Sequence, residues 1–303
     1  HTANEIILFS GYHGWSDWYL AANLGDKSNL DGQLLPGLDP AGVPRSLAGT
    51  AIPFAANDIK SIRSLIKGKE KNIAAIVIEP ARGEEAPEGF LNELKELSKE
   101  LGAVLIFDEI TSGFRACAGG IHRAYKTHPD IAVFAKSMTN GYPLSAIVGR
   151  SNVMESAQKT FISSTNWTDS IGAVASLATI NKYIELNVDK HINTQGLKVK
   201  KIWEKYSKKY NLDINISGLD SLCAYSFNHQ NSLKMNTIFT IEMLKMGFLG
   251  FRQFKPSYSH SNQDIDMYDK AVDKAFNAIS VDPECGQLST PVHHSRFEYL
   301  TKE

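Results

Sequence analysis

Short, uninterrupted apolar runs mark the first half of the chain, and several of them end at a charged residue. The runs at 73–78, 103–107 and 131–135 have the length and composition of strands that are buried on both faces of a parallel sheet. Between the first two runs, leucines at helical spacing predict a helix that begins near Pro87 and ends at Gly102. This strand–helix–strand order predicts a parallel βαβ unit with a right-handed crossover.

The sequence around this unit predicts further elements. Apolar residues at 5–9 and 146–149 indicate two more strands, and Asp58 predicts the start of a helix that Gly68 ends. Residues 25–56 are polar and rich in glycine, proline and aspartate, so we expect a long loop there.

The pattern changes in the second half of the chain. Small and apolar residues at 170–186 predict a helix that is buried on most of its circumference. A lysine-rich amphipathic helix, short strands and two more helices follow, as in a small α+β domain. We therefore predict an α/β fold with a mostly parallel sheet in a large domain, residues 1–187, and a smaller C-terminal domain, residues 188–303.

Composition and charge narrow the classes of function. The chain has 303 residues, of which 43% are hydrophobic and 21% charged, as in a globular protein with a sizeable core. A net charge of −1 and a pI of about 6.8 argue against a nucleic-acid partner. We find neither a membrane span nor a secretory signal in the sequence. The cysteines lack paired spacing, so we expect free thiols, no metal site and a cytoplasmic location.

Asp108 and Lys136 each follow one of the buried runs. The carboxyl ends of parallel strands present such side chains where open α/β sheets bind ligands. Taken singly, Asp108 also fits a helix cap and Lys136 a surface charge. Together they suit pyridoxal 5'-phosphate, because a lysine forms the Schiff base with this cofactor and an aspartate keeps the proton on its pyridine nitrogen. Ile110 is expected to face the cofactor ring.

Two other segments place candidate residues at strand ends. Tyr12 lies near two glycines after the first strand, where an aromatic side chain suits stacking on a flat ring, although core packing explains it equally well. Glu79 follows the run at 73–78 and is either a loop acid or a carboxylate near the substrate.

In this order, the segments resemble the class III pyridoxal-phosphate-dependent aminotransferases of fold type I, and among these the relatives of glutamate-1-semialdehyde aminomutase. The resemblance covers essentially the whole chain. It rests on Tyr12-His13-Gly14, Glu79-Pro80, Asp108-Glu109-Ile110, Ala135-Lys136 and, in support, Ser259-His260.

The resemblance implies a role for each matching residue. Tyr12 would stack on the ring, Asp108 would pair with its nitrogen, and Lys136 would form the Schiff base. The cofactor-binding set that it implies is Tyr12, His13, Glu79, Asp108, Ile110, Lys136 and Thr165.

The resemblance also implies a homodimer with shared active sites. Thr165, or as a second choice Ser164, would reach the cofactor phosphate of the neighbouring subunit. The partner would also cover part of the loop at 25–56, whose apolar residues are Leu34, Leu35, Val43 and Leu47.

Two departures from the family pattern affect these expectations. Many relatives have glutamine where this chain has Thr111, so a contact of that residue with the ring hydroxyl is not expected here. Residues 1–303 also contain no Gly/Ser/Thr-rich turn that would hold the cofactor phosphate, and the chain starts with His1. This indicates an N-terminally incomplete large domain, or a chain that binds the cofactor weakly or not at all.

We expect a transaminase that moves an amino group between an amino substrate and a carbonyl acceptor through Lys136. An aminomutase, which completes both half-reactions on one molecule, is the alternative enzyme. A non-catalytic fold-type I remnant is the third hypothesis, favoured by the missing phosphate turn and opposed by the retained Asp108, Lys136 and Tyr12. The substrate is not identified; the candidate clamps for a carboxylate are Arg82, Arg115, Arg123 and Arg252.

Overall fold

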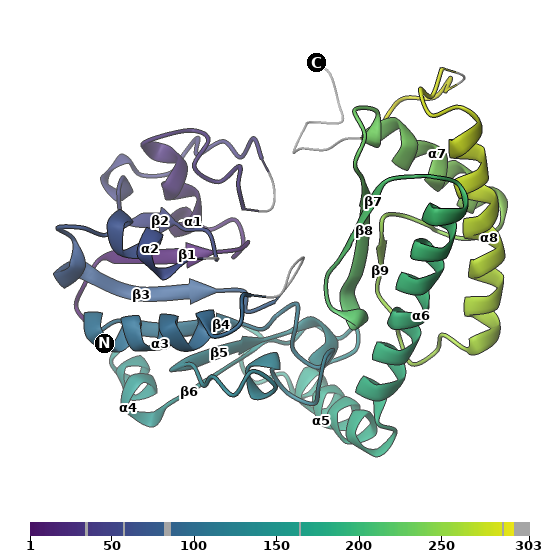
Figure 1. The fold of residues 1–303 in the computed structure, drawn as a ribbon. Helices are drawn as coiled ribbons and strands as arrows, with labels where there is room; N and C mark the ends of the chain where they lie inside the picture. The colour runs from purple at the N-terminus through teal and green to yellow at the C-terminus, as the bar shows by residue number, and fades with distance from the viewer. Residues whose placement is uncertain (34–35, 57, 82–85, 164, 287, 294–303) are drawn as a thin grey trace. The chain divides into compact units, whose positions relative to one another are not determined.

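The chain forms two compact units in the computed structural model (Figure 1). The first comprises residues 1–80 and 86–182, and the second begins at Tyr183. The structure describes residues 1–33, 36–56, 58–81, 86–163, 165–286 and 288–293.

A six-stranded sheet forms the centre of the first unit, in the order β2-β1-β3-β4-β5-β6. Strands β1 to β5 pair in parallel, and β6 pairs with β5 in the antiparallel direction at one edge. The α/β fold with a mostly parallel sheet is thus confirmed. The strands are β1 (Ile6–Ser10), β2 (Ala51–Pro53), β3 (Ile73–Ile78), β4 (Val104–Asp108), β5 (Ile131–Phe134) and β6 (Ala146–Gly149).

Two of the helix ends in this unit show the expected capping chemistry. The side chain of Asp58 accepts hydrogen bonds from the amides of Lys60 and Ser61, and Gly102 ends its helix in the left-handed region at φ +64°. The helices are α1 (Asp17–Leu20), α2 (Ile59–Leu65), α3 (Phe90–Leu101), α4 (Ser151–Met154) and α5 (Ser170–Glu185).

The sheet buries side chains on both faces because successive residues of a strand point in opposite directions. Leu8 and Leu105 pack with α2 and α3 on one face. Phe9 and Val77 pack on the other face with Tyr19 and the segment that follows it. Both layers hold the strands rigidly, so their carboxyl ends form a fixed edge of the sheet.

The segment at 25–56 differs from the long loop that we expected. It contains β2, which pairs with β1, and it folds onto its own chain: Val43 is buried and Leu47 is partly buried against the same cluster as Phe9. Val43 is therefore covered by its own chain and not by a partner, whereas cover of Leu47 by a partner stays a prediction. Leu34 and Leu35 lie outside the described residues.

Helix α5 is less buried in the single chain than its composition predicted. Ile171, Val174 and Leu177 are 62%, 64% and 65% exposed, whereas Gly172 and Ser176 are buried. The prediction of burial on most of the circumference is wrong for one copy of the chain, because the packed side of the helix is narrow. An apolar face remains exposed on it.

Among its described residues, the second unit combines a three-stranded antiparallel sheet with three α-helices. Its core contains Trp203, Tyr225, Phe239 and Phe276, all fully buried. The boundary that we proposed at residue 187 falls in the turn between α5 and α6. The elements are α6 (Val188–Lys209), β7 (Ile214–Ser217), β8 (Cys223–Phe227), α7 (Ser232–Lys245), β9 (Gln253–Phe254) and α8 (Asn262–Val281).

Within the part of the chain that the structure describes, no helix combines the length and apolarity needed to cross a membrane.

Candidate active site

The carboxyl ends of four adjacent strands carry most of the predicted site residues. Tyr12 and His13 follow β1, Glu79 follows β3, Asp108 ends β4, and Lys136 follows β5. These strands are neighbours in the sheet, so one edge presents all five side chains. The sheet topology therefore gathers residues that are far apart in the sequence.

Asp108 is buried and both of its carboxylate oxygens accept hydrogen bonds. Oδ2 lies 2.8 Å from Nδ1 of His13, and Oδ1 accepts the Ile110 amide at 3.1 Å. Nε2 of His13 lies 3.0 Å from the carbonyl oxygen of Ser10, which only accepts hydrogen bonds. Both ring nitrogens of His13 thus have an oxygen neighbour, and the Nδ1 contact orients the Asp108 carboxylate.

Lys136 occupies an unusual backbone conformation with φ +49°, which lysine rarely adopts. Its Nζ donates a hydrogen bond to Oγ1 of Thr111 at 2.9 Å. The side chain is exposed in the single chain. Strained backbone of this kind often marks functional sites.

Glu79 organises the turn after β1. Its Oε2 accepts the Tyr12 amide at 2.9 Å. Gly11 adopts φ +108°, and a Cβ there would lie 2.7 Å from Glu79 Oε2, so only glycine fits beside this carboxylate. Glu79 thus holds the segment that carries Tyr12 and His13.

Tyr12 is partly buried and meets Trp15 and Tyr19 edge-on, with ring centroids 6.2 and 5.8 Å away. These contacts agree with the core-packing interpretation and leave stacking on a cofactor as a prediction. Thr165 is exposed in the segment before α5, and its assigned contact likewise stays a prediction. Ser164 lies outside the described residues.

The candidate carboxylate clamps differ in their surroundings. Arg115 is half-buried, Arg123 donates to the carbonyl oxygen of Ala118 at 2.9 Å, and Arg252 is exposed beside Phe251 in the second unit. Arg82 lies outside the described part of the chain. No residue of this group is assigned to the substrate.

Sequence reasoning missed two residues near the site. Thr111 contacts the amine of Lys136. From the sequence, this residue was noted only because it replaces the glutamine that many relatives have, without a contact to the ring hydroxyl of the cofactor. Glu109 is fully buried and bonds to Ser112, Ile121 and His122. The sequence signal for Glu109 was its position directly after the end of a strand, before a segment rich in glycine.

A comparison with protein-family models decides the family. The model of the class-III aminotransferases matches residues 2–272. The chain belongs to this family. Its members bind pyridoxal phosphate, in agreement with the sequence resemblance.

Curated relatives and solved structures agree with this assignment. A glutamate-1-semialdehyde 2,1-aminomutase of Ruminiclostridium cellulolyticum is 31% identical over 90% of this chain and 67% of its own length. A 3-aminobutyryl-CoA aminotransferase of Cloacimonas acidaminovorans is 26% identical over 88% of this chain and 63% of its own length. The chain thus spans about two thirds of the length of these relatives. The FumI protein of Sphingopyxis sp. MTA144, solved with PLP, has a TM-score of 0.82 at 22% identity, over 93% of this chain and 67% of its own, which supports fold type I.

The described residues fit the pyridine ring and the aldehyde of pyridoxal phosphate. Asp108 offers an oriented, buried carboxylate for the ring nitrogen, and Lys136 offers an accessible amine for the aldehyde. Both groups stand at the same edge of the sheet, on neighbouring strands.

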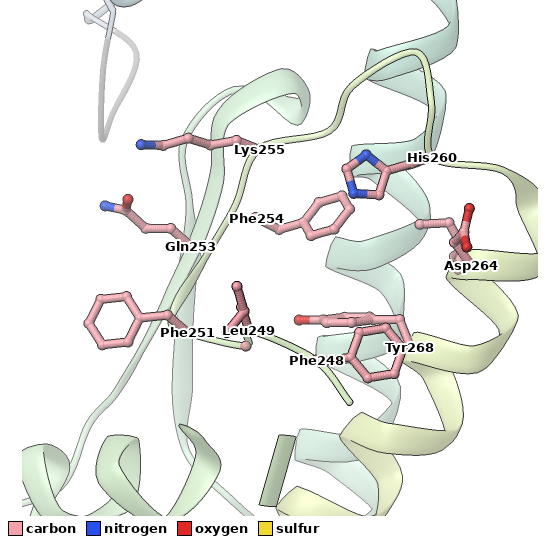
Figure 2. A pocket seen from close by; sticks show the side chains of 11 residues that line it. Phe248, Leu249, Phe251, Gln253, Phe254, Lys255, His260, Asp264 and Tyr268 are labelled. Atoms are coloured by element: carbon pink, nitrogen blue, oxygen red, sulfur yellow. The ribbon is translucent and has the colours of Figure 1, made fainter. Parts of the chain in front are cut away.

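The second unit has a separate hollow of about 280 Å³ between β9 and α8 (Figure 2). Phe248, Phe254 and Tyr268 form its apolar wall. Gln253 and Lys255 extend away from Phe254, on the other side of the strand (Figure 2). His260 and Asp264 lie on the same side as Phe254 and Tyr268, so the wall of the hollow combines apolar and polar side chains (Figure 2).

Proposed function

We propose that this chain acts as a pyridoxal-phosphate-dependent transaminase, which moves an amino group between an amino substrate and a carbonyl acceptor. One observation carries this proposal: the oriented carboxylate of Asp108 and the accessible amine of Lys136 stand at the ends of adjacent strands. Class-III membership supports it, since the relatives include aminotransferases.

Each proposed residue has a distinct task. When bound, pyridoxal phosphate supplies an aldehyde for amines and a ring that withdraws electrons from the substrate. Asp108 holds a hydrogen on the ring nitrogen, and His13 keeps the carboxylate in place. Nζ of Lys136 would hold the aldehyde carbon, and the free amine of the same residue would move the proton of the substrate α-carbon. Tyr12, Ile110 and Glu79 would line the ring, with Glu79 fixing Tyr12.

The working form that we propose is a homodimer. The exposed apolar face of α5, formed by Ile171, Val174 and Leu177, would be covered by a second copy of the chain. Thr165, just before this helix, would then reach the cofactor phosphate in the partner. We place the protein in the cytoplasm, in agreement with its free cysteines.

An aminomutase is the second candidate, favoured by the relative of that name, which is 31% identical over 90% of this chain. The two activities differ in stoichiometry. A transaminase releases one keto product for each amine consumed, whereas an aminomutase returns the amino group to the same carbon skeleton.

The test uses the complete protein loaded with pyridoxal phosphate. Borohydride reduction followed by peptide mass spectrometry should place the cofactor on Lys136. A panel of amines should then release a stoichiometric carbonyl product and leave aminated cofactor, visible in the absorbance spectrum. An amine that is isomerised without release of a carbonyl product favours the aminomutase. Absence of any adduct on Lys136 refutes both enzymes and favours a non-catalytic remnant.

A further inference from the structure

Glu109 is a fully buried carboxylate next to the proposed site residue Asp108. Four donors from three residues surround it. Oε2 accepts from Ser112 Oγ at 2.6 Å and from the Ile121 amide at 3.0 Å. Oε1 accepts from the amide of His122 at 3.0 Å and lies 2.8 Å from Nδ1 of the same residue. Burial of a carboxylate is costly without such donors, so this set is built around the charge.

The donors lie at both ends of one segment, residues 110–122. The backbone folds back within it: the Phe114 amide donates to the carbonyl oxygen of Gly119 at 2.7 Å. At Gly120, a Cβ would lie 2.6 Å from Glu109 Oε1. The carboxylate therefore closes the segment into a compact loop, and a glycine leaves room for it.

This loop carries the residue that meets Lys136. Thr111 is buried between Asp108, at the end of β4, and Ser112, which is bonded to Glu109. The Lys136 amine donates to its hydroxyl. The position of Thr111 is thus determined on one side by the sheet and on the other by Glu109.

We propose that Glu109 is a positioning residue: its carboxylate holds the segment 110–122 so that the Thr111 hydroxyl orients the Lys136 amine for reaction with an aldehyde. The part that concerns reactivity rests on the function proposed above for Lys136. The part that concerns the loop rests on the contacts of Glu109 alone.

Cys117 makes the loop measurable. It is half-buried within the segment, and its Sγ lies 3.3 Å from the carbonyl oxygen of Gly120 as a donor. Alkylation of this thiol by iodoacetamide, followed by mass spectrometry, therefore reports the opening of the loop without any cofactor. Cys223, whose thiol is fully buried, serves as an internal reference.

The main variant is Glu109→Gln, in which an amide nitrogen would face backbone or hydroxyl donors. The matched control is Asp130→Asn. Asp130 Oδ2 also accepts a backbone amide, that of Leu105 at 2.9 Å, but at the opposite end of β4 and β5. Asp130→Asn therefore removes a carboxylate that accepts a backbone amide in the same unit but outside the segment 110–122.

We expect Glu109→Gln in the complete protein to raise the alkylation rate of Cys117 about tenfold, the effect of losing one hydrogen bond to a charged group. The rate at which pyridoxal phosphate becomes trapped on Lys136 by borohydride should fall by a similar factor. Thr111→Val should slow trapping and leave the alkylation rate of Cys117 unchanged, because it removes the hydroxyl that contacts Lys136 and no contact of Glu109. Asp130→Asn should change neither rate.

Three outcomes overturn the proposal. The first is a Cys117 alkylation rate in Glu109→Gln equal to that of the wild type, and the second is an equal rise of this rate in Asp130→Asn. The third is a normal rate of cofactor trapping on Lys136 in a variant whose Cys117 is alkylated faster. Should Glu109→Gln fail to fold, Gly120→Ala replaces it, since its Cβ displaces the same carboxylate. Should the wild-type protein trap no cofactor, the proposed function fails. The loop role of Glu109 is then supported or refuted by Cys117 alone.

Discussion

Nδ1 of His13 lies 2.8 Å from Oδ2 of Asp108, although His13 follows β1 and Asp108 ends β4, and these strands are separated in the sheet by β3. The contact crosses the end of β3 and ties the two outer segments of the site together. It leaves the carboxylate with one oxygen facing His13 and the other facing the Ile110 amide. The group is therefore oriented by the protein itself, as a partner for a protonated ring must be.

Asp108→Asn should retain cofactor binding and lose turnover by roughly 10²-fold or more, because a neutral amide no longer stabilises positive charge at the ring nitrogen. Single-turnover kinetics and the cofactor absorbance of the loaded protein check this. Turnover near that of the wild type would show that Asp108 is only a cap for the segment after β4.

Lys136→Ala should abolish the borohydride-stable adduct, since Nζ is the atom assigned to the aldehyde. Lys126→Ala is the matched control: Lys126 is also exposed and also has positive φ, at +56°. Peptide mass spectrometry after reduction decides the matter. A reducible adduct of unchanged yield in Lys136→Ala would remove this lysine from the site.

The strand ends of the site were predictable because a charged residue after an apolar run must leave the core where a parallel sheet ends. That rule located Asp108, Lys136 and Glu79, and the family pattern added Tyr12 and His13. The short-range contacts were not predictable. The contact of Thr111 with Lys136 depends on the exact path of a glycine-rich turn, which apolar periodicity does not encode.

Helix α5 shows a second limit of sequence reasoning. Its composition indicates that Ile171, Val174 and Leu177 need burial, but composition does not say which chain provides it. The segment at 25–56 shows the converse, because a polar stretch with few apolar residues still formed β2 and placed Val43 in its own core. Sparse apolar residues are enough when a neighbouring strand and a glycine-rich backbone fix them.

The second unit should lose stability at alkaline pH. Burial raises the pKa of the Cys223 thiol from 9.0 to about 12, and burial also raises the pKa values of Tyr225 and Tyr268. Between pH 9 and about pH 12, the folded chain keeps the proton of Cys223 that the unfolded chain has released. Unfolding therefore becomes more favourable as the pH rises. Each group contributes about 1.4 kcal/mol per pH unit above its unfolded pKa.

Urea titrations at pH 8 and pH 10 test this dependence. Cys223→Ala should lose less stability between the two pH values than the wild type, by about 1 kcal/mol. An identical pH dependence of Cys223→Ala and the wild type would show that this thiol does not resist ionisation in the folded chain.

Assembly provides the last prediction. An apolar face on α5 that is more than 60% exposed at Ile171, Val174 and Leu177 favours association, because its burial against a second copy removes apolar surface from water. Sedimentation of the complete protein should show a dimer. Ile171→Glu combined with Leu177→Glu should convert it to monomers, since two carboxylates would be desolvated in the interface. Val281→Glu, at an apolar residue 77% exposed in the second unit, is the control and should leave the dimer intact.

The monomeric variant should also bind pyridoxal phosphate more weakly than the wild type. Thr165→Ala should weaken this binding without dissociating the dimer. A wild-type monomer with full activity would refute both the shared site and the contact assigned to Thr165.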